Sequence, residues 1–108
     1  MIGSQSAAFD TELRVTAPFT GVAQLLGTLV NSPAILFFSN DTDVDVFFAD
    51  NSGSTKGLTM TAGEKIVLDN TANRTGEVNT LTFNVGTKFY VTGAAGTGTF
   101  RVGVIYAK

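Results

Sequence analysis

The chain contains no cysteine, no histidine and no tryptophan, and each absence excludes a kind of protein. Without cysteine there is neither a disulfide framework nor a thiolate metal site, so the hydrophobic core must hold the fold by itself. Without histidine the chain lacks the usual general base near neutral pH and the commonest metal ligand. Without tryptophan it lacks a broad stacking surface for sugars and bases. We therefore expect neither an enzyme nor a cofactor.

Charged residues are also scarce. They make up 15% of the 108 residues, and the formal net charge is −2. Such a chain lacks the positive field with which proteins bind nucleic acids or anionic membranes. No apolar run approaches the length of a membrane span, and the first ten residues have neither the basic nor the apolar region of a signal peptide. We expect no nucleic-acid or membrane partner, and synthesis in a reducing cytoplasm.

Short apolar alternations separated by turn-forming residues occupy most of the chain. They recur at the spacing of roughly 8 to 12 residues that is typical of β-sandwiches and jelly rolls, and they predict about eight strands. Two packed sheets would enclose the nine phenylalanines better than one sheet could. The sequence therefore predicts an all-β fold, a β-sandwich or jelly roll, with residues 11–108 as a single domain.

Residues 1–10 are small and polar apart from Ile2 and Phe9, and we interpret them as a short N-terminal arm. The arm is either a frayed terminus or a segment that orders against a partner, with Phe9 as its anchor. Residues 21–30 (GVAQLLGTLV) are ambiguous, because their apolar spacing fits a strand or a single helical turn while two glycines weaken any helix.

Residues 34–60 hold the most informative stretch. Residues 34–39 (AILFFS) form a continuous apolar run that is short enough to be a strand buried on both faces, and residues 40–43 are expected to turn the chain. In the strand expected after the turn, Asp43, Asp45 and Phe47 share one face. Phe47 is the apolar exception on that acidic face, so it lies either under a loop or in a contact with another molecule.

Asp41, Asp43 and Asp45 alternate, so an extended segment would place three carboxylates on one face at intervals of roughly 7 Å. This spacing allows a weak candidate site for Ca²⁺, but the glycine and glutamate of an EF-hand loop are missing. It also lies within the range of an inverting glycosidase, which requires a sugar-binding cleft. We favour the simplest interpretation, a solvated polar face that discourages pairing at a sheet edge. No catalytic residue is assigned.

The later part of the chain continues the pattern. Residues 70–79 form the longest expected loop, and loops of that length in small domains are often functional. Residues 80–85 are expected to form a strand. Residues 93–98 form a glycine-rich connector without the lysine of a phosphate-binding loop, and they read as a hairpin turn.

Three stretches carry a resemblance to a known family. They are SNDTDVDVFFAD at 39–50, LTMTAGEKIVLD at 58–69 and FYVTGAAGTGTFRVGVIYAK at 89–108. Their order resembles small β-sandwich virion proteins of tailed bacteriophages, over about two-thirds of the chain. The resemblance implies a capsid decoration or cement protein, a jelly roll without enzymatic activity that sits on the capsid surface, often as a homotrimer, and binds the major capsid protein.

The residues expected to face such a partner are Phe9 on the arm, and Phe47, Asp43 and Asp45 on the acidic face. Two other functions stay open. One is a component of the phage neck, tail or fibre anchor. The other is a carbohydrate-binding jelly-roll module, which would use Asp41, Asp43 and Asp45 with Ca²⁺.

Overall fold

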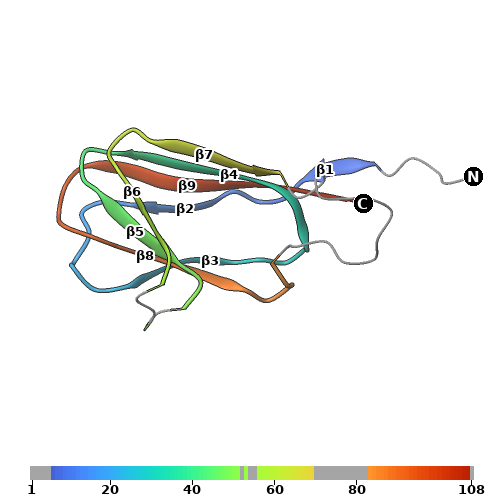
Figure 1. Cartoon of the computed structure of the whole chain (residues 1–108), viewed down its shortest axis with the longest axis horizontal. Helices are drawn as coiled ribbons and strands as arrows, with labels where there is room; N and C mark the ends of the chain where they lie inside the picture. Colours follow the sequence, from blue (N-terminus) through green and yellow to red (C-terminus); the bar gives the residue numbers. More distant parts are fainter. Residues whose placement is uncertain (1–5, 52, 54–55, 70–82, 108) are drawn as a thin grey trace, which may run out of the picture.

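The protein is a sandwich of two antiparallel β-sheets in a computed structural model that describes residues 6–51, 53, 56–69 and 83–107 (Figure 1). This confirms the all-β prediction, with nine strands over those residues where about eight were expected. No helix in the described ranges is long and apolar enough to span a membrane.

The two sheets divide the strands five to four. Sheet A contains β1 (Ala7–Phe9), β2 (Leu13–Thr16), β4 (Pro33–Thr42), β7 (Lys65–Asp69) and β9 (Gly98–Ala107). Sheet B contains β3 (Gln24–Thr28), β5 (Val46–Ala49), β6 (Leu58–Met60) and β8 (Lys88–Gly93). In sheet A the order is β1-β9-β4-β7, with β2 also paired to β9, and in sheet B it is β3-β8-β5-β6. Long-range pairing therefore defines the fold.

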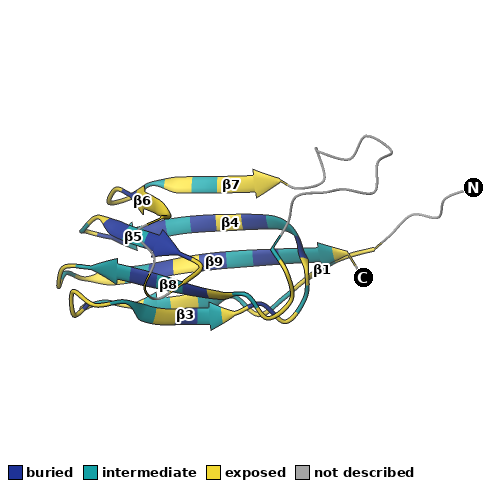
Figure 2. Ribbon diagram, turned by 60° about the horizontal axis from the view of Figure 1, so that its bottom comes forward, coloured by how far each residue is buried: buried dark blue, intermediate teal, exposed yellow. Residues whose placement is uncertain are grey.

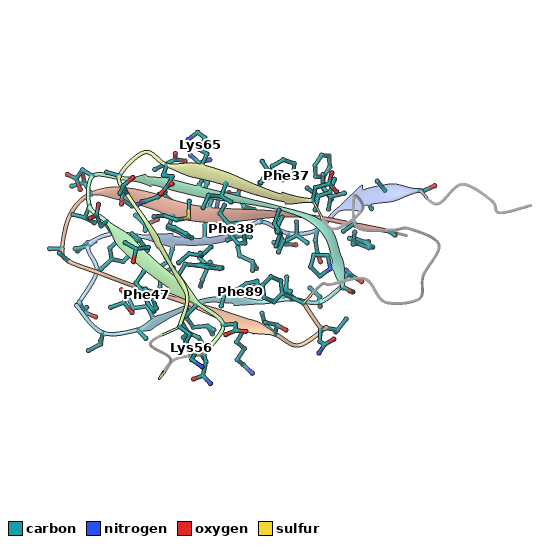
Figure 3. The ribbon with its side chains drawn as sticks, viewed as in Figure 1. Phe37, Phe38, Phe47, Lys56, Lys65 and Phe89 are labelled. Atoms are coloured by element: carbon teal, nitrogen blue, oxygen red, sulfur yellow. The ribbon has the colours of Figure 1, made fainter. Side chains whose placement is uncertain are left out.

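Buried residues of both sheets face each other across the sandwich (Figure 2), and phenylalanine rings make up much of this core (Figure 3). The ring of Phe48 from sheet B lies 4.7 Å from that of Phe38 and 5.7 Å from that of Phe100, both in sheet A, measured between centroids. It also lies 4.9 Å from Phe89 in its own sheet. Aromatic pairs at these distances add to the free energy gained by burying their area. Phe48 thus joins the two layers.

Strand β4 departs from two predictions. The strand at 34–39 is confirmed, but its burial on both faces is wrong, because none of the described elements covers the outer face of sheet A and Phe37 is 40% exposed there. The turn expected at residues 40–43 is also wrong in position. β4 continues to Thr42, since Asn40 and Thr42 are buried and find hydrogen-bond partners inside the protein.

The ambiguous stretch at 21–30 is a strand, β3, with a bulge between Leu25 and Gly27. Residues 7–9 of the expected arm form β1, which pairs with the end of β9 in the register Phe9 to Ile105. Residues 83–85 are not in a strand. The predicted loop at 70–79 and the beginning of the predicted strand at 80–85 lie outside the described residues.

Asn40 is the buried polar residue that joins the sheets. Its side-chain amide donates hydrogen bonds to the carbonyl groups of Val44, Met60 and Thr61 at 2.9–3.1 Å. Its side-chain oxygen accepts from the backbone N–H and the hydroxyl of Thr42. Because Asn40 belongs to sheet A and Met60 to sheet B, this one side chain fixes the β4–β5 turn and the β6–β7 turn together.

Asn40→Asp should destabilise the fold strongly although it hardly changes the side-chain volume. An aspartate has no N–H groups for the three carbonyls and would bury a charge, so we expect a loss of about 3 kcal/mol in the free energy of unfolding. Urea denaturation measures it. Asn84→Asp, at an exposed asparagine, is the matched control. Equal stability of the two variants would contradict the role assigned to Asn40.

Candidate functional site

The outer face of sheet A carries a group of apolar side chains that no described element covers. The register places Phe9, Ile105 and Ile35 in one row across the sheet, and Phe37 and Val67 in the next. We call these five residues the apolar half. Phe9 is 84% exposed, Val67 59% and Phe37 40%, so the patch is open to solvent. Contiguous exposed apolar side chains of this kind mark interaction surfaces.

A glycine gives the apolar half its hollow shape. Gly103 lies opposite Phe37 in the register, and a Cβ placed there would stand 3.7 Å from the Phe37 side chain. Because Gly103 has no side chain, nothing projects from the outer face of the sheet at this position beside Phe37. An open hollow of about 400 Å³ results, with Phe9 and Phe37 on its apolar side and Asp41, Lys65 and Arg101 on its polar side.

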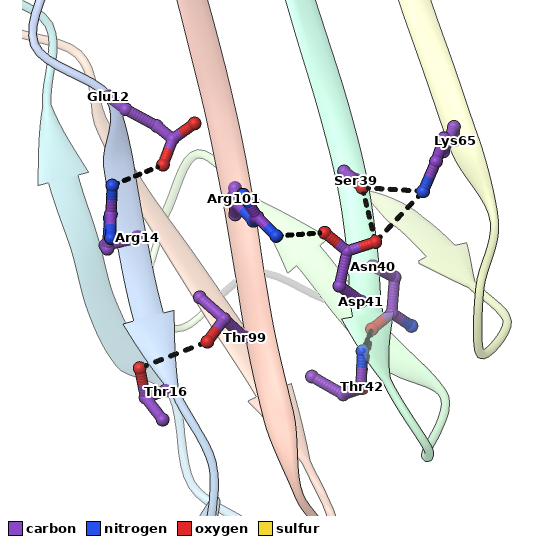
Figure 4. A network of polar contacts seen from close by, with 10 residues as sticks. All are labelled: Glu12, Arg14, Thr16, Ser39, Asn40, Asp41, Thr42, Lys65, Thr99 and Arg101. Atoms are coloured by element: carbon purple, nitrogen blue, oxygen red, sulfur yellow. Dashed lines mark hydrogen bonds and ion pairs between the residues drawn. The ribbon is translucent and has the colours of Figure 1, made fainter.

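The other half of the same face is charged, and Asp41 lies at its centre (Figure 4). Asp41 Oδ1 accepts hydrogen bonds from Ser39 Oγ at 2.8 Å and Lys65 Nζ at 2.9 Å, and Asp41 Oδ2 pairs with Arg101 at 2.9 Å. Arg14 in β2 forms a further ion pair at 2.9 Å with Glu12, which directly precedes the strand. We call Asp41, Lys65, Arg101, Glu12 and Arg14 the charged half.

These contacts change the acidity of Asp41. The hydrogen bond from Lys65, with smaller contributions from Ser39 and from the charge of Arg101, lowers the pKa of Asp41 below its ordinary value of 3.8. Partial burial opposes this shift but does not cancel it. The carboxylate is therefore charged at neutral pH and holds two cationic side chains in fixed positions beside the hollow.

Asp43 has a structural role at the end of the sandwich. Its carboxylate accepts hydrogen bonds from the backbone N–H of Thr97 at 2.8 Å and from the Thr97 hydroxyl at 3.2 Å. The backbone hydrogen bond is the main reason why the pKa of Asp43 is lowered. Asp43 thereby ties the β4–β5 turn to the β8–β9 turn, and Asp45 lies exposed in the same β4–β5 connection.

The prediction that Asp41, Asp43 and Asp45 share one extended segment is wrong. Asp41 is in β4 of sheet A, and the chain bends at residues 43–44 before β5 begins in sheet B. Asp41 and Asp43 bind different partners as a result. Within the ranges that the structure describes, no three acidic residues are grouped so that they could hold a metal ion.

Phe47 projects from the outer face of sheet B and is half-buried (Figure 3). A Cβ at Gly57 would come within 3.0 Å of the ring atom Cζ of Phe47 and even closer to the carbonyl oxygen of Phe48. Glycine at position 57 thus lets the segment before β6 pass close over Phe47. Gly57 packs against the ring of Phe47, in agreement with a placement beneath a loop, and a contact of Phe47 with another molecule stays a prediction.

The four predicted interface residues do not form one surface. Phe9 pairs with Ile105, whereas Asp43 donates its backbone N–H to Thr97, eight residues earlier along the same stretch of chain. At about 3.3 Å per residue the two positions are roughly 26 Å apart. Phe47 belongs to the opposite sheet. Phe9 is the one member of the set that lies on the outer face of sheet A.

Sequence reasoning did not single out Phe37, Val67, Lys65 and Arg101 as members of a candidate interaction surface. The signal was present in part, because Phe37 alternates with Leu36 and Phe38 and so must face away from them if one face of β4 is outside. The unbroken apolar run concealed this, since it fits a strand that is buried on both faces. Lys65 and Arg101 belong to strands that lie on either side of β4, which the sequence does not reveal.

Acid should remove the contribution of Asp41 to stability. Its pKa is lower in the folded than in the unfolded state, so the unfolded state binds more protons in the window below about pH 4, and stability falls as the pH falls through the folded pKa. Asp41→Asn should cost about 1 kcal/mol at pH 7, a small loss because the cluster is solvent-exposed. The difference in the free energy of unfolding between Asp41→Asn and wild type should shrink toward pH 2.

Thermal unfolding of wild type and Asp41→Asn between pH 2 and pH 7 measures this, with Asp45→Asn as the control at an exposed acid of the next turn. A gap between wild type and Asp41→Asn that stays constant at every pH would contradict the assignment, because it would mean that Asp41 contributes without its charge.

Comparison of the chain with protein-family models, with curated proteins and with solved structures gives no match. The function is therefore proposed from the surfaces of the chain itself, together with the resemblance noted in the three stretches at 39–50, 58–69 and 89–108.

Proposed function

We propose that this protein is a non-enzymatic structural component of a bacteriophage virion. It decorates the capsid surface and stabilises it by binding the major capsid protein across neighbouring shell subunits. It acts as a homo-oligomer, for which the resemblance implies a trimer. The observation that carries the proposal is the outer face of sheet A, where the apolar half adjoins the charged half.

The apolar half supplies the affinity. Side chains that are 40–84% exposed, as Val67, Phe37 and Phe9 are, gain free energy when a partner covers them. Aromatic residues in the centre of an interface contribute more than their share of this energy. A shell surface that fills the hollow over Gly103 would cover the exposed parts of Phe9 and Phe37, which both line the hollow.

The charged half supplies orientation. Lys65 and Arg101 are held by Asp41, so their positions are already fixed before a partner binds. Partly exposed charges at the rim of an interface add little affinity but favour one docking register over others. An apolar contact with a charged border on one side can therefore bind a shell subunit in a single orientation.

Stabilisation of the shell then follows from mass action. A protein that binds only the assembled capsid lowers the free energy of the assembled state relative to separated subunits. If each copy touches two or three subunits, and several copies are joined in an oligomer, weak contacts multiply into avidity. No chemical step is required.

The purified protein should bind mature, expanded capsids and raise the temperature at which they are disrupted. Binding is measured by co-sedimentation with the particles, and disruption by the release of packaged DNA on heating. Immature capsids are the control, since they present a different arrangement of subunits. A protein that binds no form of the capsid would contradict the proposal.

The contact face is tested by single substitutions. Phe37→Ser should weaken capsid binding by about tenfold or more, because it removes an aromatic residue from the centre of the proposed interface. Leu25→Ser is the matched control, since Leu25 is 51% exposed but belongs to sheet B. If Leu25→Ser weakens binding and Phe37→Ser does not, the outer face of sheet A is not the contact surface.

A place in the phage neck or tail is the nearest rival. Both positions use the same kind of apolar contact, so the distinguishing quantity is the number of copies in each virion. Decoration of the head requires hundreds of copies, whereas a neck or tail ring of closed symmetry contains about a dozen. Quantitative mass spectrometry of purified particles gives this number.

A further inference from the structure

Strand β7 lies at the margin of sheet A (Figure 2). Among the described strands it pairs with β4 alone, through residues 65–69. Its middle residue Val67 is 59% exposed and Leu68 is 39% exposed. An apolar edge strand of this kind is a template for pairing with another strand.

The hydrogen-bond pattern shows which backbone groups point toward the margin. Asn40 N–H donates to the carbonyl of Glu64 at 2.9 Å, which makes Asn40 and Glu64 a hydrogen-bonded pair. In an antiparallel ladder such pairs alternate, so Ile66 and Leu68 direct their N–H and C=O groups at β4. Lys65 and Val67 therefore direct theirs away from β4, to the side of β7 where no described strand pairs.

The sequence of β7, KIVLD, is complementary to itself when it is reversed. In an antiparallel pair centred on Val67, the Lys65 of one copy lies opposite the Asp69 of the other, at both ends of the pair. Ile66 lies opposite Leu68 on the inner face, and the two Val67 side chains meet on the outer face. Every cross-strand pair is then apolar with apolar or cation with anion, which are the favourable combinations.

We propose that β7 pairs with β7 of a second copy of this chain, antiparallel and in the register centred on Val67. The pairing joins two copies of sheet A into one continuous sheet. It also brings together the two apolar halves, because Val67 lies next to Phe37 in each copy. The contact is isologous, so it closes with two copies and does not propagate into a fibre.

Lys65 can take part without leaving its place in the charged half. Its ammonium group has three N–H donors, and two of them are directed at Ser39 and Asp41. Charges on an edge strand often block pairing, and like charges directly opposite each other are destabilising. In the register centred on Val67 the charges that meet are unlike, which distinguishes β7 from a protected edge.

The proposal does not depend on the function in a virion, and its test uses the purified protein alone. Sedimentation equilibrium should show a reversible dimer of twice the 11.3 kDa chain mass. Val67→Asp should weaken dimerisation by about tenfold or more, because two carboxylates would meet at the centre of the pair. Val22→Asp is the matched control, since Val22 is 65% exposed and lies outside β7.

Two charge reversals test the register. Lys65→Glu alone sets glutamate against aspartate, and Asp69→Lys alone sets lysine against lysine, so each variant should be a weaker dimer than wild type. When the two are mixed, each opposed pair is again a cation with an anion, and a heterodimer should form. Circular dichroism confirms that each variant is folded.

Three results would overturn the proposal. The first is a wild-type monomer at millimolar concentration. The second is an oligomer, such as the trimer that the resemblance implies, whose mass is unchanged by Val67→Asp. The third is a mixture of folded Lys65→Glu and Asp69→Lys variants that does not associate. Capsid binding is measured separately and tests the proposed contact between sheet A and the shell. A wild-type monomer would in addition contradict the homo-oligomer of the proposed function.

Discussion

The buried amide of Asn40 is the contact on which the rest of the structure depends. Two sheets that touch through apolar side chains can slide against each other, whereas hydrogen bonds to the carbonyls of Val44, Met60 and Thr61 have direction. These hydrogen bonds fix the positions of the β4–β5 turn and the β6–β7 turn. An unmade hydrogen bond in a core is costly, so alternative registers are excluded.

That fixed register gives the outer face of sheet A its pattern. Because β4 lies between β9 and β7, its outward residues set Phe37 beside Gly103 and Val67, and Asp41 between Lys65 and Arg101. A shift of one residue in β4 would turn Phe37 into the core and Asn40 out of it. The same constraint thus holds the fold together and separates an apolar half from a charged half on one surface.

The sequence predicts the layers well and the surfaces poorly, for physical reasons. Alternation of apolar and polar residues marks strands and predicted the last strand, β9, whereas β3 stayed ambiguous between a strand and a helical turn. The sequence does not show which residues of β4 face the core, because the residues on both faces of its apolar run are apolar. Asp41 and Asp43 were separated from each other by contacts with Lys65 and Thr97, which are remote in sequence. The spacing of residues along the sequence cannot reveal partners that are remote in the chain.

We propose that the outer face of sheet A faces the shell of a virion. A cryo-electron microscopy map of intact mature particles, at a resolution that separates the two sheets, tests it most directly. The account predicts density for many copies across the capsid surface, with Phe9 and Phe37 turned toward the shell subunits and sheet B turned toward solvent. Density confined to a ring at the neck, or copies that contact the shell through sheet B, would contradict it.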